Sequence, residues 1–229
     1  MMKLKVFENF YRNLLISFKL LNDFIHLPIQ LKHIVLYFRI HKWSKFQINS
    51  FPNLIHCKDF NDKIQWLKLF DQTELIIKCS DKILVKDFIE KETGKKNFAT
   101  ILQVADNIEL IELDNLPNSF VIKTNHDSGS VYIIKDKKSF DKNKLYPKIK
   151  SAMNSAYGIE KGEWAYSLIK TKVFVEEYIE NKTCLIPADY KFHCVNGVPK
   201  VLHYIYDKSV KTKEILVPLD SLNNCDNIF

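Results

Sequence analysis

The chain has 229 residues, of which 46% are hydrophobic and 27% charged, and this profile excludes a disordered or a fibrous protein. The net charge of +7 favours anionic ligands or surfaces in general, including phosphate, nucleic acid and lipid headgroups. The five cysteines form no Cys-x-x-Cys pair, and the sequence shows neither a membrane-spanning apolar run nor a signal peptide, so we expect reduced thiols in a cytoplasmic protein.

Residues 1–50 differ from the rest of the chain in charge and in aromatic content. They hold eight Lys or Arg residues and nine aromatic residues against two acids, Glu8 and Asp23. Apolar residues recur there at steps of three and four, which predicts one apolar stripe on a helix. Two interpretations are open: a helical hairpin packed on the main body, or a basic amphipathic segment that rests on an anionic membrane face. The stripe consists of Phe7, Phe10, Tyr11, Leu14, Phe18, Leu21 and Ile25.

Two short helices follow before the first predicted strand. Asn61 can cap the first helix, with Ile64 and Leu67 turned inward. The second helix starts around Lys82, and Gly94 is well placed to cap its C-terminus. On these residues alone, Lys82 is an ordinary solvated lysine on a helix surface.

A β-hairpin with a polar tip is predicted after a strand at residues 99–104. Residues 120–122 and 131–134 are apolar and β-prone, and the polar connection between them holds Lys123 and Gly129. The plain interpretation is a hairpin whose tip carries ordinary turn residues. The alternative is a phosphate loop, in which small residues let backbone N–H groups approach an anion and the lysine supplies positive charge. The hairpin alone is favoured at this point, because a single Gly is a weak phosphate signature.

Two further segments carry charge next to predicted secondary structure. The lysine-rich residues 136–150 predict a solvated helix and loop, and they lack the interleaved aromatics with which proteins stack nucleic-acid bases. Residues 173–180 predict a strand that ends in a polar hinge; an edge strand with a charged end is the plainer interpretation. The lysine-rich segment therefore reads as a solvated surface and not as a nucleic-acid site.

The strongest local prediction is a second hairpin near the end of the chain. Residues 189–195 alternate strictly in polarity, which is typical of a strand. Asn196-Gly197 then predicts a tight turn into a strand over residues 198–206. One face of the first strand is polar and either meets solvent or lines a cleft, and spacing alone does not decide between them. This polar face carries Asp189, Lys191 and His193.

Six blocks of sequence, from about Phe46 to about Leu222, share their order and spacing with one family. Each block is weak alone, whereas six in sequence at matching spacing are specific. Together they resemble the ATP-grasp superfamily, in its teichuronopeptide-biosynthesis (TupA-like) branch. The blocks are Phe60–Leu69; Cys79–Lys82 with Val85; Ser119–Lys123 with Asn125, His126, Ser128 and Gly129; Glu163-Trp164 with Tyr166; Glu176–Ile179; and Asp189–Phe192 with Asn196, Gly197 and Lys200.

The resemblance implies an α+β fold in which two lobes close on ATP. In this chain the C-terminal lobe would be incomplete, and a basic helical segment would precede the fold. The implied division is a basic amphipathic helical segment at 1–50, a helical part of the ATP-grasp region at 51–98, a lid with its glycine-containing loop and hinge at 99–180, and the start of the C-terminal lobe at 181–229.

The resemblance also implies which residues bind the nucleotide. Lys82 and Lys123 match two lysines expected on the phosphates and near the adenine. The mobile loop that folds over the phosphates is matched by Asn125, His126, Ser128, Gly129 and Ser130.

A hinge strand and a catalytic strand are implied in the same way. The backbone of the hinge is expected to read the adenine edge, and an acid just beyond it to bind the ribose hydroxyls. Asp189 and Lys191 match the strand that faces the phosphates and are the candidate catalytic residues. The hinge is matched by Glu176, Glu177, Tyr178 and Ile179, with Glu180 at the ribose.

The activity implied by the family is ATP-dependent joining of a carboxylate to an amine through an acyl phosphate, with Mg²⁺ and lysines neutralising the transferring phosphoryl group. The implied substrates are sugar acids or amino acids of a cell-surface or capsular polysaccharide. Other enzymes of polysaccharide biosynthesis would be partners. The implied location is the cytoplasm, at the inner face of the membrane if residues 1–50 make peripheral contact.

One departure from the family concerns magnesium. Family members carry two further strands whose acids hold the metal, and nothing after Lys208 matches them. Glu214, Asp220 and Asp226 lie in a different context, so the sequence provides no metal ligand set. We therefore expect a C-terminally truncated member whose turnover is impaired.

Two other classes of protein remain as alternatives. A non-catalytic protein that binds nucleotide or a partner enzyme is favoured by the missing magnesium acids. A glycosyltransferase-like polysaccharide enzyme is disfavoured, because the chain has no Asp-x-Asp motif for a metal-bound nucleotide sugar.

Overall fold

The computed structural model describes residues 34–159, 161–180, 187–208 and 211–220. The chain separates into two compact units, with the boundary between Tyr178 and Ile179, and each unit is described by itself. The predicted apolar stripe of residues 7–25 lies outside the described residues. The four-part division implied by the family stays a prediction.

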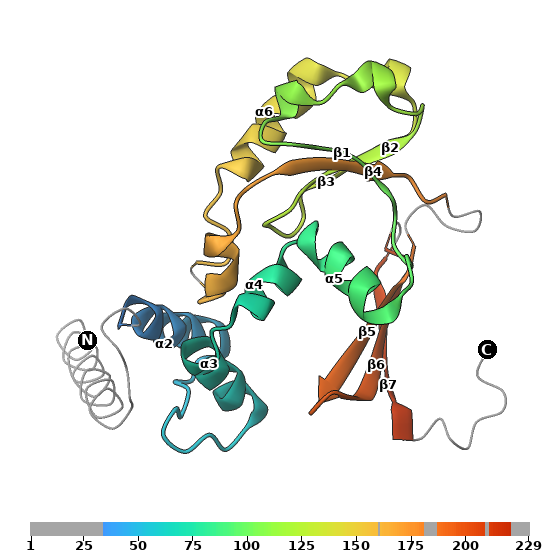
Figure 1. The fold of residues 1–229 in the computed structure, drawn as a ribbon. Coiled ribbons are helices and arrows are strands. Elements are labelled where there is room, and N and C mark those ends of the chain that lie inside the picture. Colours follow the sequence, from blue (N-terminus) through green and yellow to red (C-terminus); the bar gives the residue numbers. More distant parts are fainter. Residues whose placement is uncertain (1–33, 160, 181–186, 209–210, 221–229) are drawn as a thin grey trace. The chain divides into compact units, whose positions relative to one another are not determined.

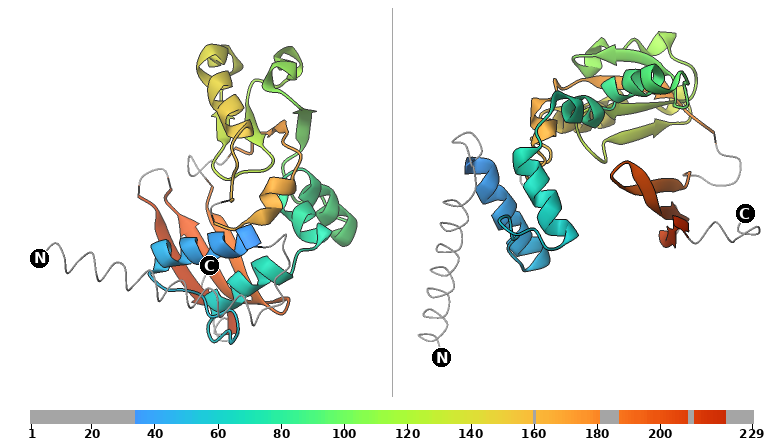
Figure 2. Two further views of the ribbon diagram at one scale, coloured as in Figure 1. Left: turned by 90° about the vertical axis from the view of Figure 1, so that its left-hand side faces the viewer. Right: turned by 60° about the horizontal axis from the view of Figure 1, so that its bottom comes forward.

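The described part of the first unit begins with two helices, α2 (Ile34–Ile48) and α3 (Phe60–Phe70), which lie side by side (Figures 1 and 2). Tyr37 and Ile40 of α2 form a small buried core with Leu54 and with Leu69 of α3. Asp59 caps α3 by accepting the N–H of Asp62 at 2.8 Å, so the prediction of Asn61 as the cap is wrong. Both residue types cap helices well, and the helix begins at Phe60, two residues earlier than a cap at Asn61 would allow.

The buried face of α3 also differs from the prediction. Asp62, Gln65 and Leu69 are buried, whereas Leu67 is exposed and Ile64 is only partly covered. The carboxylate of Asp62 accepts the backbone N–H groups of Asn53 at 2.8 Å and of Lys58 at 3.2 Å. These bonds to the preceding loop turn the acid inward and set the rotation of the helix.

The next two helices, α4 (Glu74–Ser80) and α5 (Leu84–Thr93), are joined by a short connection. Asp81 in this connection accepts the N–H groups of Ile83 at 2.8 Å and of Leu84 at 3.3 Å, which starts α5. Gly94 ends α5 in the left-handed conformation (φ 68°), as predicted.

A four-stranded antiparallel sheet follows, in the order β1-β4-β2-β3. The hairpin of β2 and β3 confirms the prediction for the middle of the chain. Strand β4 lies between β1 and β2, so the interpretation of residues 173–180 as an edge strand is wrong. The strands are β1 (Ile101–Ala105), β2 (Phe120–Thr124), β3 (Val131–Ile134) and β4 (Val173–Glu177).

The two faces of this sheet have different coverings (Figure 1). Helix α6 (Lys142–Met153) packs on one face, where Phe120, Ile122 and Val175 are buried against Ile149. Helices α4 and α5 lie on the opposite side of the sheet. Because successive side chains of a strand point to opposite faces, every second residue of these strands faces the side of α4 and α5. Short 3₁₀ helices complete the unit: η2 (Ile108–Leu110), η3 (Leu113–Asn115), η4 (Lys137–Ser139) and η5 (Trp164–Leu168).

The second unit is a three-stranded antiparallel sheet in the order β5-β6-β7. Asn196 and Gly197 both have positive φ (51° and 77°), as a two-residue hairpin turn of this kind requires, and the predicted hairpin is confirmed. The strands are β5 (Asp189–Val195), β6 (Val198–Tyr206) and β7 (Lys213–Pro218).

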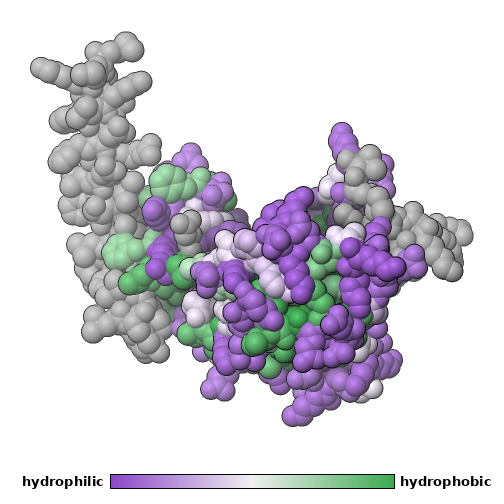
Figure 3. All heavy atoms as spheres, turned by 90° about the horizontal axis from the view of Figure 1, so that it is seen from above, coloured by the Kyte–Doolittle hydropathy of each residue, from purple (hydrophilic) through white to green (hydrophobic). Residues whose placement is uncertain are grey.

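Helices and antiparallel sheets together confirm the predicted α+β class. Polar residues cover much of the surface seen in Figure 3, with apolar patches between them. Among the described helices, none is both long and apolar enough to cross a membrane.

Candidate functional site

Lys82 is bound to the polar loop at the tip of the β2–β3 hairpin. Its ammonium group donates to the carbonyl oxygen of Thr124 at 2.7 Å, to the carbonyl oxygen of Asp127, and to the carboxylate of Asp127 at 3.2 Å. The backbone N–H of Lys82 also donates to the carbonyl oxygen of Asn125 at 3.1 Å. The side chain is partly buried, so the interpretation of Lys82 as an ordinary solvated lysine is wrong.

Asp127 is the buried centre of this loop. Besides Lys82, its carboxylate accepts the hydroxyl groups of Thr124 and Ser130. Burial by itself raises the pKa of Asp127, but the hydrogen bonds from Ser130 and Thr124 and the Lys82 ammonium outweigh burial, and the pKa is lowered. Asp127 is therefore a carboxylate over most of the pH range, and Gly129 (φ 99°) completes the turn around it.

Asn125 and His126 anchor the base of the loop. The side-chain amide of Asn125 donates to Asp81 at 2.9 Å and to the carbonyl oxygen of Lys170 at 3.0 Å, and its oxygen accepts the N–H of Lys172 at 2.7 Å. His126 is buried with Nε2 3.3 Å from the carbonyl oxygen of Ser155. Both of the amide's donors and its oxygen are in use, so this side chain holds the loop in place.

A second cluster of charged side chains lies on the face of the sheet opposite α6. Lys123 of β2 forms an ion pair with the buried carboxylate of Glu176 on β4. Lys86 of α5 donates to the other oxygen of Glu176 at 2.7 Å and to the carbonyl oxygen of Ala99 at 2.6 Å. One carboxylate therefore faces two ammonium groups, which leaves a net positive charge at this position.

These two clusters adjoin one another. Burial lowers the pKa of Lys82, Asp127 opposes this effect, and the positive charge of Lys123 lowers the pKa further. The influence of Lys123 on Lys82 means that both ammonium groups act in one electrostatic field. The site therefore combines Lys82, Lys86 and Lys123 with two acids, Asp127 and Glu176.

The family model described as TupA-like ATP-grasp matches residues 62–214 of this chain. The chain belongs to the TupA-like ATP-grasp family. The match extends from α3 to the start of β7 and thus covers the loop, both lysine clusters and the part of the second unit up to residue 214. Searches among curated proteins and among solved structures found no match.

Membership of the ATP-grasp family gives the lysine site a chemical interpretation, since this family generally binds ATP. Two lysines, a glycine-containing turn and an adjacent face of net positive charge fit a chain of phosphates. Sequence reasoning missed Lys86 and Asp127 as parts of this site. Lys86 could have been found because it lies four residues after Lys82, a spacing that places two side chains on the same face of a helix. Asp127 could have been found because it lies within the loop that the resemblance identifies.

The hinge residues lie at the end of β4 and across the boundary of the two units. Glu176 points its side chain at lysines, whereas Glu177 is exposed and its backbone N–H donates to the carbonyl oxygen of Thr100 at 2.9 Å. Tyr178 is partly covered and ends the first unit. Ile179 and Glu180 are exposed and belong to the second unit.

The two candidate catalytic residues lie on β5 of the second unit. Asp189 accepts a hydrogen bond from Lys208 at 2.7 Å, and Lys191 is exposed and opposite His203 in the register with β6. The predicted common face of Asp189, Lys191 and His193 agrees with the strand register. Their catalytic roles, and the contact of Ser128 and Ser130 with nucleotide, stay predictions.

The described residues do not fit a magnesium ion. Mg²⁺ needs oxygen ligands that are available to it, and the two site acids already bind lysines. Within the described part of the chain, no group of three or more His, Cys, Asp or Glu side chains has the arrangement of a metal site.

Proposed function

We propose that this protein binds ATP through Lys82, Lys123 and the loop of residues 125–130. We further propose that it is a ligase-like protein of cell-surface or capsular polysaccharide biosynthesis. The observation that carries the proposal is that Lys82 binds Asp127 of this loop and Thr124 just before it, while Lys123 directly precedes Thr124 on β2, in a chain of the ATP-grasp family. The proposed substrates are a sugar acid or an amino acid and an amine, in the cytoplasm, alongside other enzymes of the same polymer.

The proposed reaction transfers the γ-phosphoryl group of ATP to a carboxylate. The carboxylate oxygen attacks the γ-phosphorus and ADP leaves, which gives an acyl phosphate; the amine then attacks the acyl carbon and phosphate leaves. In this scheme the ammonium groups of Lys82 and Lys123 compensate negative charge on the phosphate oxygens. The backbone N–H groups around Gly129 approach the phosphates closely, because no side chain blocks that position.

Calorimetric titration with ATP, in the presence and absence of Mg²⁺, tests the nucleotide site. We expect Lys123→Ala to weaken ATP binding at least tenfold, since a charge-assisted contact to phosphate contributes about 1.5–3 kcal/mol. Lys148→Ala is the matched control, because Lys148 is an exposed lysine on α6, whose helix covers the opposite face of the sheet. Equal ATP affinity in the parent chain and in Lys123→Ala would overturn the proposed site.

A second candidate is a protein that binds nucleotide or a partner without turnover. It is favoured by the pairing of Asp127 and Glu176 with lysines, which leaves these acids unsuited to hold a metal. The two candidates differ in one measurement: ADP formation in the presence of ATP, Mg²⁺, a mixture of sugar acids and amino acids, and an amine. Binding without ADP formation in any mixture supports the second candidate.

A further inference from the structure

Helix α2 presents an unusual face to solvent. Val35, Phe38 and Phe46 are 57%, 50% and 77% exposed, and Arg39 and Lys42 lie between them. With 3.6 residues per turn, these five positions fall on one side of the helix. The exposed face of α2 (Val35, Phe38, Arg39, Lys42 and Phe46) is therefore both apolar and cationic.

Packing among the described residues of the first unit does not account for this face. The opposite side of α2 already supplies the core residues Tyr37 and Ile40, which pack with Leu54 and Leu69. The helix contains no Asp or Glu at any position. An exposed helix face normally mixes charges of both signs, so apolar side chains among basic ones indicate a binding surface.

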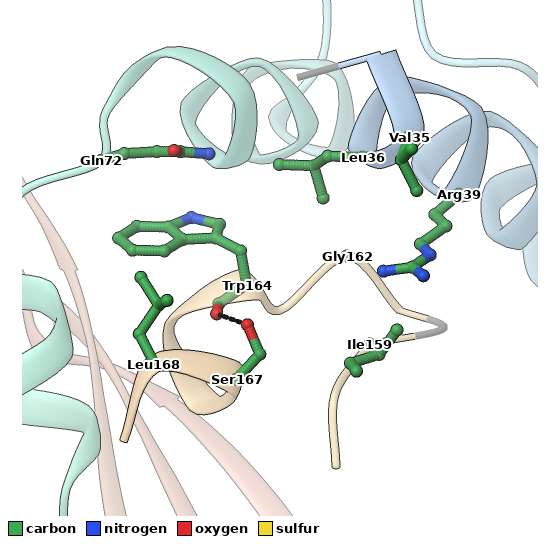
Figure 4. A pocket seen from close by; sticks show the side chains of 9 residues that line it. All are labelled: Val35, Leu36, Arg39, Gln72, Ile159, Gly162, Trp164, Ser167 and Leu168. Atoms are coloured by element: carbon green, nitrogen blue, oxygen red, sulfur yellow. Dashed lines mark hydrogen bonds between the residues drawn. The ribbon is translucent and has the colours of Figure 1, made fainter. Parts of the chain in front are cut away.

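A hollow runs along the same face. Arg39, Lys42, Trp43 and Phe46 line a cavity of about 600 Å³ together with Ile159. Arg39 and Ile159 also border a neighbouring cavity of about 230 Å³, in which Trp164 and Leu168 form the far wall (Figure 4). Room for a small anionic group therefore exists beside exposed aromatic side chains.

We propose that the exposed face of α2 docks on an anionic lipid bilayer. Aromatic and aliphatic side chains insert at the boundary of headgroups and acyl chains, and basic side chains bind the lipid phosphates. Charge disfavours two other occupants. Residues 1–33 carry five basic residues against two acids, and a second copy of this face would bring the same cations together. This inference goes beyond the proposed function and does not depend on nucleotide binding.

Sedimentation of the full chain with vesicles tests the proposal. We expect binding to vesicles of phosphatidylcholine and phosphatidylglycerol in equal amounts, and little binding to phosphatidylcholine alone. Arg39→Gln with Lys42→Gln should reduce the partition coefficient about thirtyfold, the equivalent of about 1 kcal/mol for each basic residue near an anionic surface. The matched control is Lys144→Gln with Lys148→Gln, the same charge change on exposed positions four residues apart on α6.

A second pair of variants tests the apolar part of the contact. Phe38→Ser with Phe46→Ser should reduce binding at least tenfold, whereas Phe60→Ser should not, although Phe60 is also a largely exposed phenylalanine of the first unit. If the α6 control lost as much vesicle binding as the α2 variants, binding would depend on net charge alone, and the proposal would be overturned. Full binding by both α2 variants would overturn it as well, and would leave residues 1–33 as the contact. Sedimentation without lipid completes the test. If the parent chain self-associates but binds no lipid, and if the α2 variants abolish the self-association, then a second copy of the chain occupies this face.

Discussion

At the scale of single residues, the site is organised by two buried carboxylates, each shared between several donors. Asp127 joins a loop to a distant lysine, and Glu176 joins a strand to a helix. Removing one partner of such a group leaves the others with an unsatisfied buried charge, which costs more than the interaction itself contributes. Conservative substitutions are therefore the informative ones.

Asp127→Asn keeps the shape of the side chain and removes its charge. We expect the free energy of unfolding to fall by about 1–2 kcal/mol at pH 7, because the Lys82 ammonium loses its counter-charge. The pKa of Asp127 is lowered in the folded chain, so its stabilisation is present above the ordinary Asp pKa and is lost as the pH falls through the folded pKa. The parent chain and the variant should therefore converge in acid, as urea unfolding at a series of pH values would show.

The control for this prediction is Asp106→Asn. Asp106 pairs with Lys170 and Lys172 on the exposed surface, where solvent screens ion pairs and they contribute little, so we expect a much smaller change than for Asp127→Asn at any pH. A difference between Asp127→Asn and the parent that is the same at pH 7 and in acid would contradict the charge argument.

At the scale of elements, the turn before η5 and helix α2 are in close contact. Gly162 has φ 70°, and a Cβ atom there would lie 2.8 Å from a side-chain carbon of Ile40 and 3.2 Å from one of Leu36. The turn can therefore pack this closely on the helix only because Gly162 has no side chain. Two residues further on, Trp164 lies beside Gln72 in the pocket of Figure 4.

Gly162→Ala should destabilise the first unit by about 2–3 kcal/mol. About 1 kcal/mol comes from the left-handed backbone conformation and the remainder from displacement of α2. Gly94→Ala isolates the backbone contribution, because Gly94 has nearly the same φ (68°) and no heavy atom within 4 Å of the added carbon. Urea unfolding followed by tryptophan fluorescence would measure both; equal destabilisation by the two variants would rule out the packing contribution.

Local patterns predicted the elements better than they predicted how those elements face one another. The hairpins were predictable because their signals are contiguous, as in Asn196-Gly197 between two alternating runs. The rotation of α3 was not, because it depends on bonds from Asp62 to a loop that has no pattern of its own. The Lys123–Glu176 pair depends on β2 pairing with β4, two strands about fifty residues apart, and no local rule gives that pairing.

At the scale of the whole molecule, the three tryptophans give a selective probe. Trp43, Trp66 and Trp164 all lie in the first unit, which also contains the lysine site. Tryptophan fluorescence therefore reports unfolding of the unit that we propose binds ATP, and it does so without any need for turnover.

ATP at a hundredfold excess over its dissociation constant should stabilise the first unit by about 2.7 kcal/mol. The shift should be seen in the tryptophan-monitored unfolding curve of the parent chain and should be absent in Lys82→Ala at the same ATP concentration. AMP is the control ligand, because it lacks the β- and γ-phosphates that the lysines would bind. Stabilisation of equal size by AMP and ATP would mean that the phosphate chain is not what the site recognises.

The carboxylate of Asp127 has one further consequence for any anion that approaches Lys82. The position beside that ammonium is held by an anion which is part of the chain, and whose effective concentration is on the order of millimolar or higher. An incoming ligand must exchange with it, so a weak single-charge anion gains almost nothing by the exchange. A ligand with several negative charges can displace Asp127 from Lys82 with one charge and interact with Lys123 through another. The Asp127 carboxylate therefore competes with external anions for Lys82 and favours ligands that carry more than one negative charge.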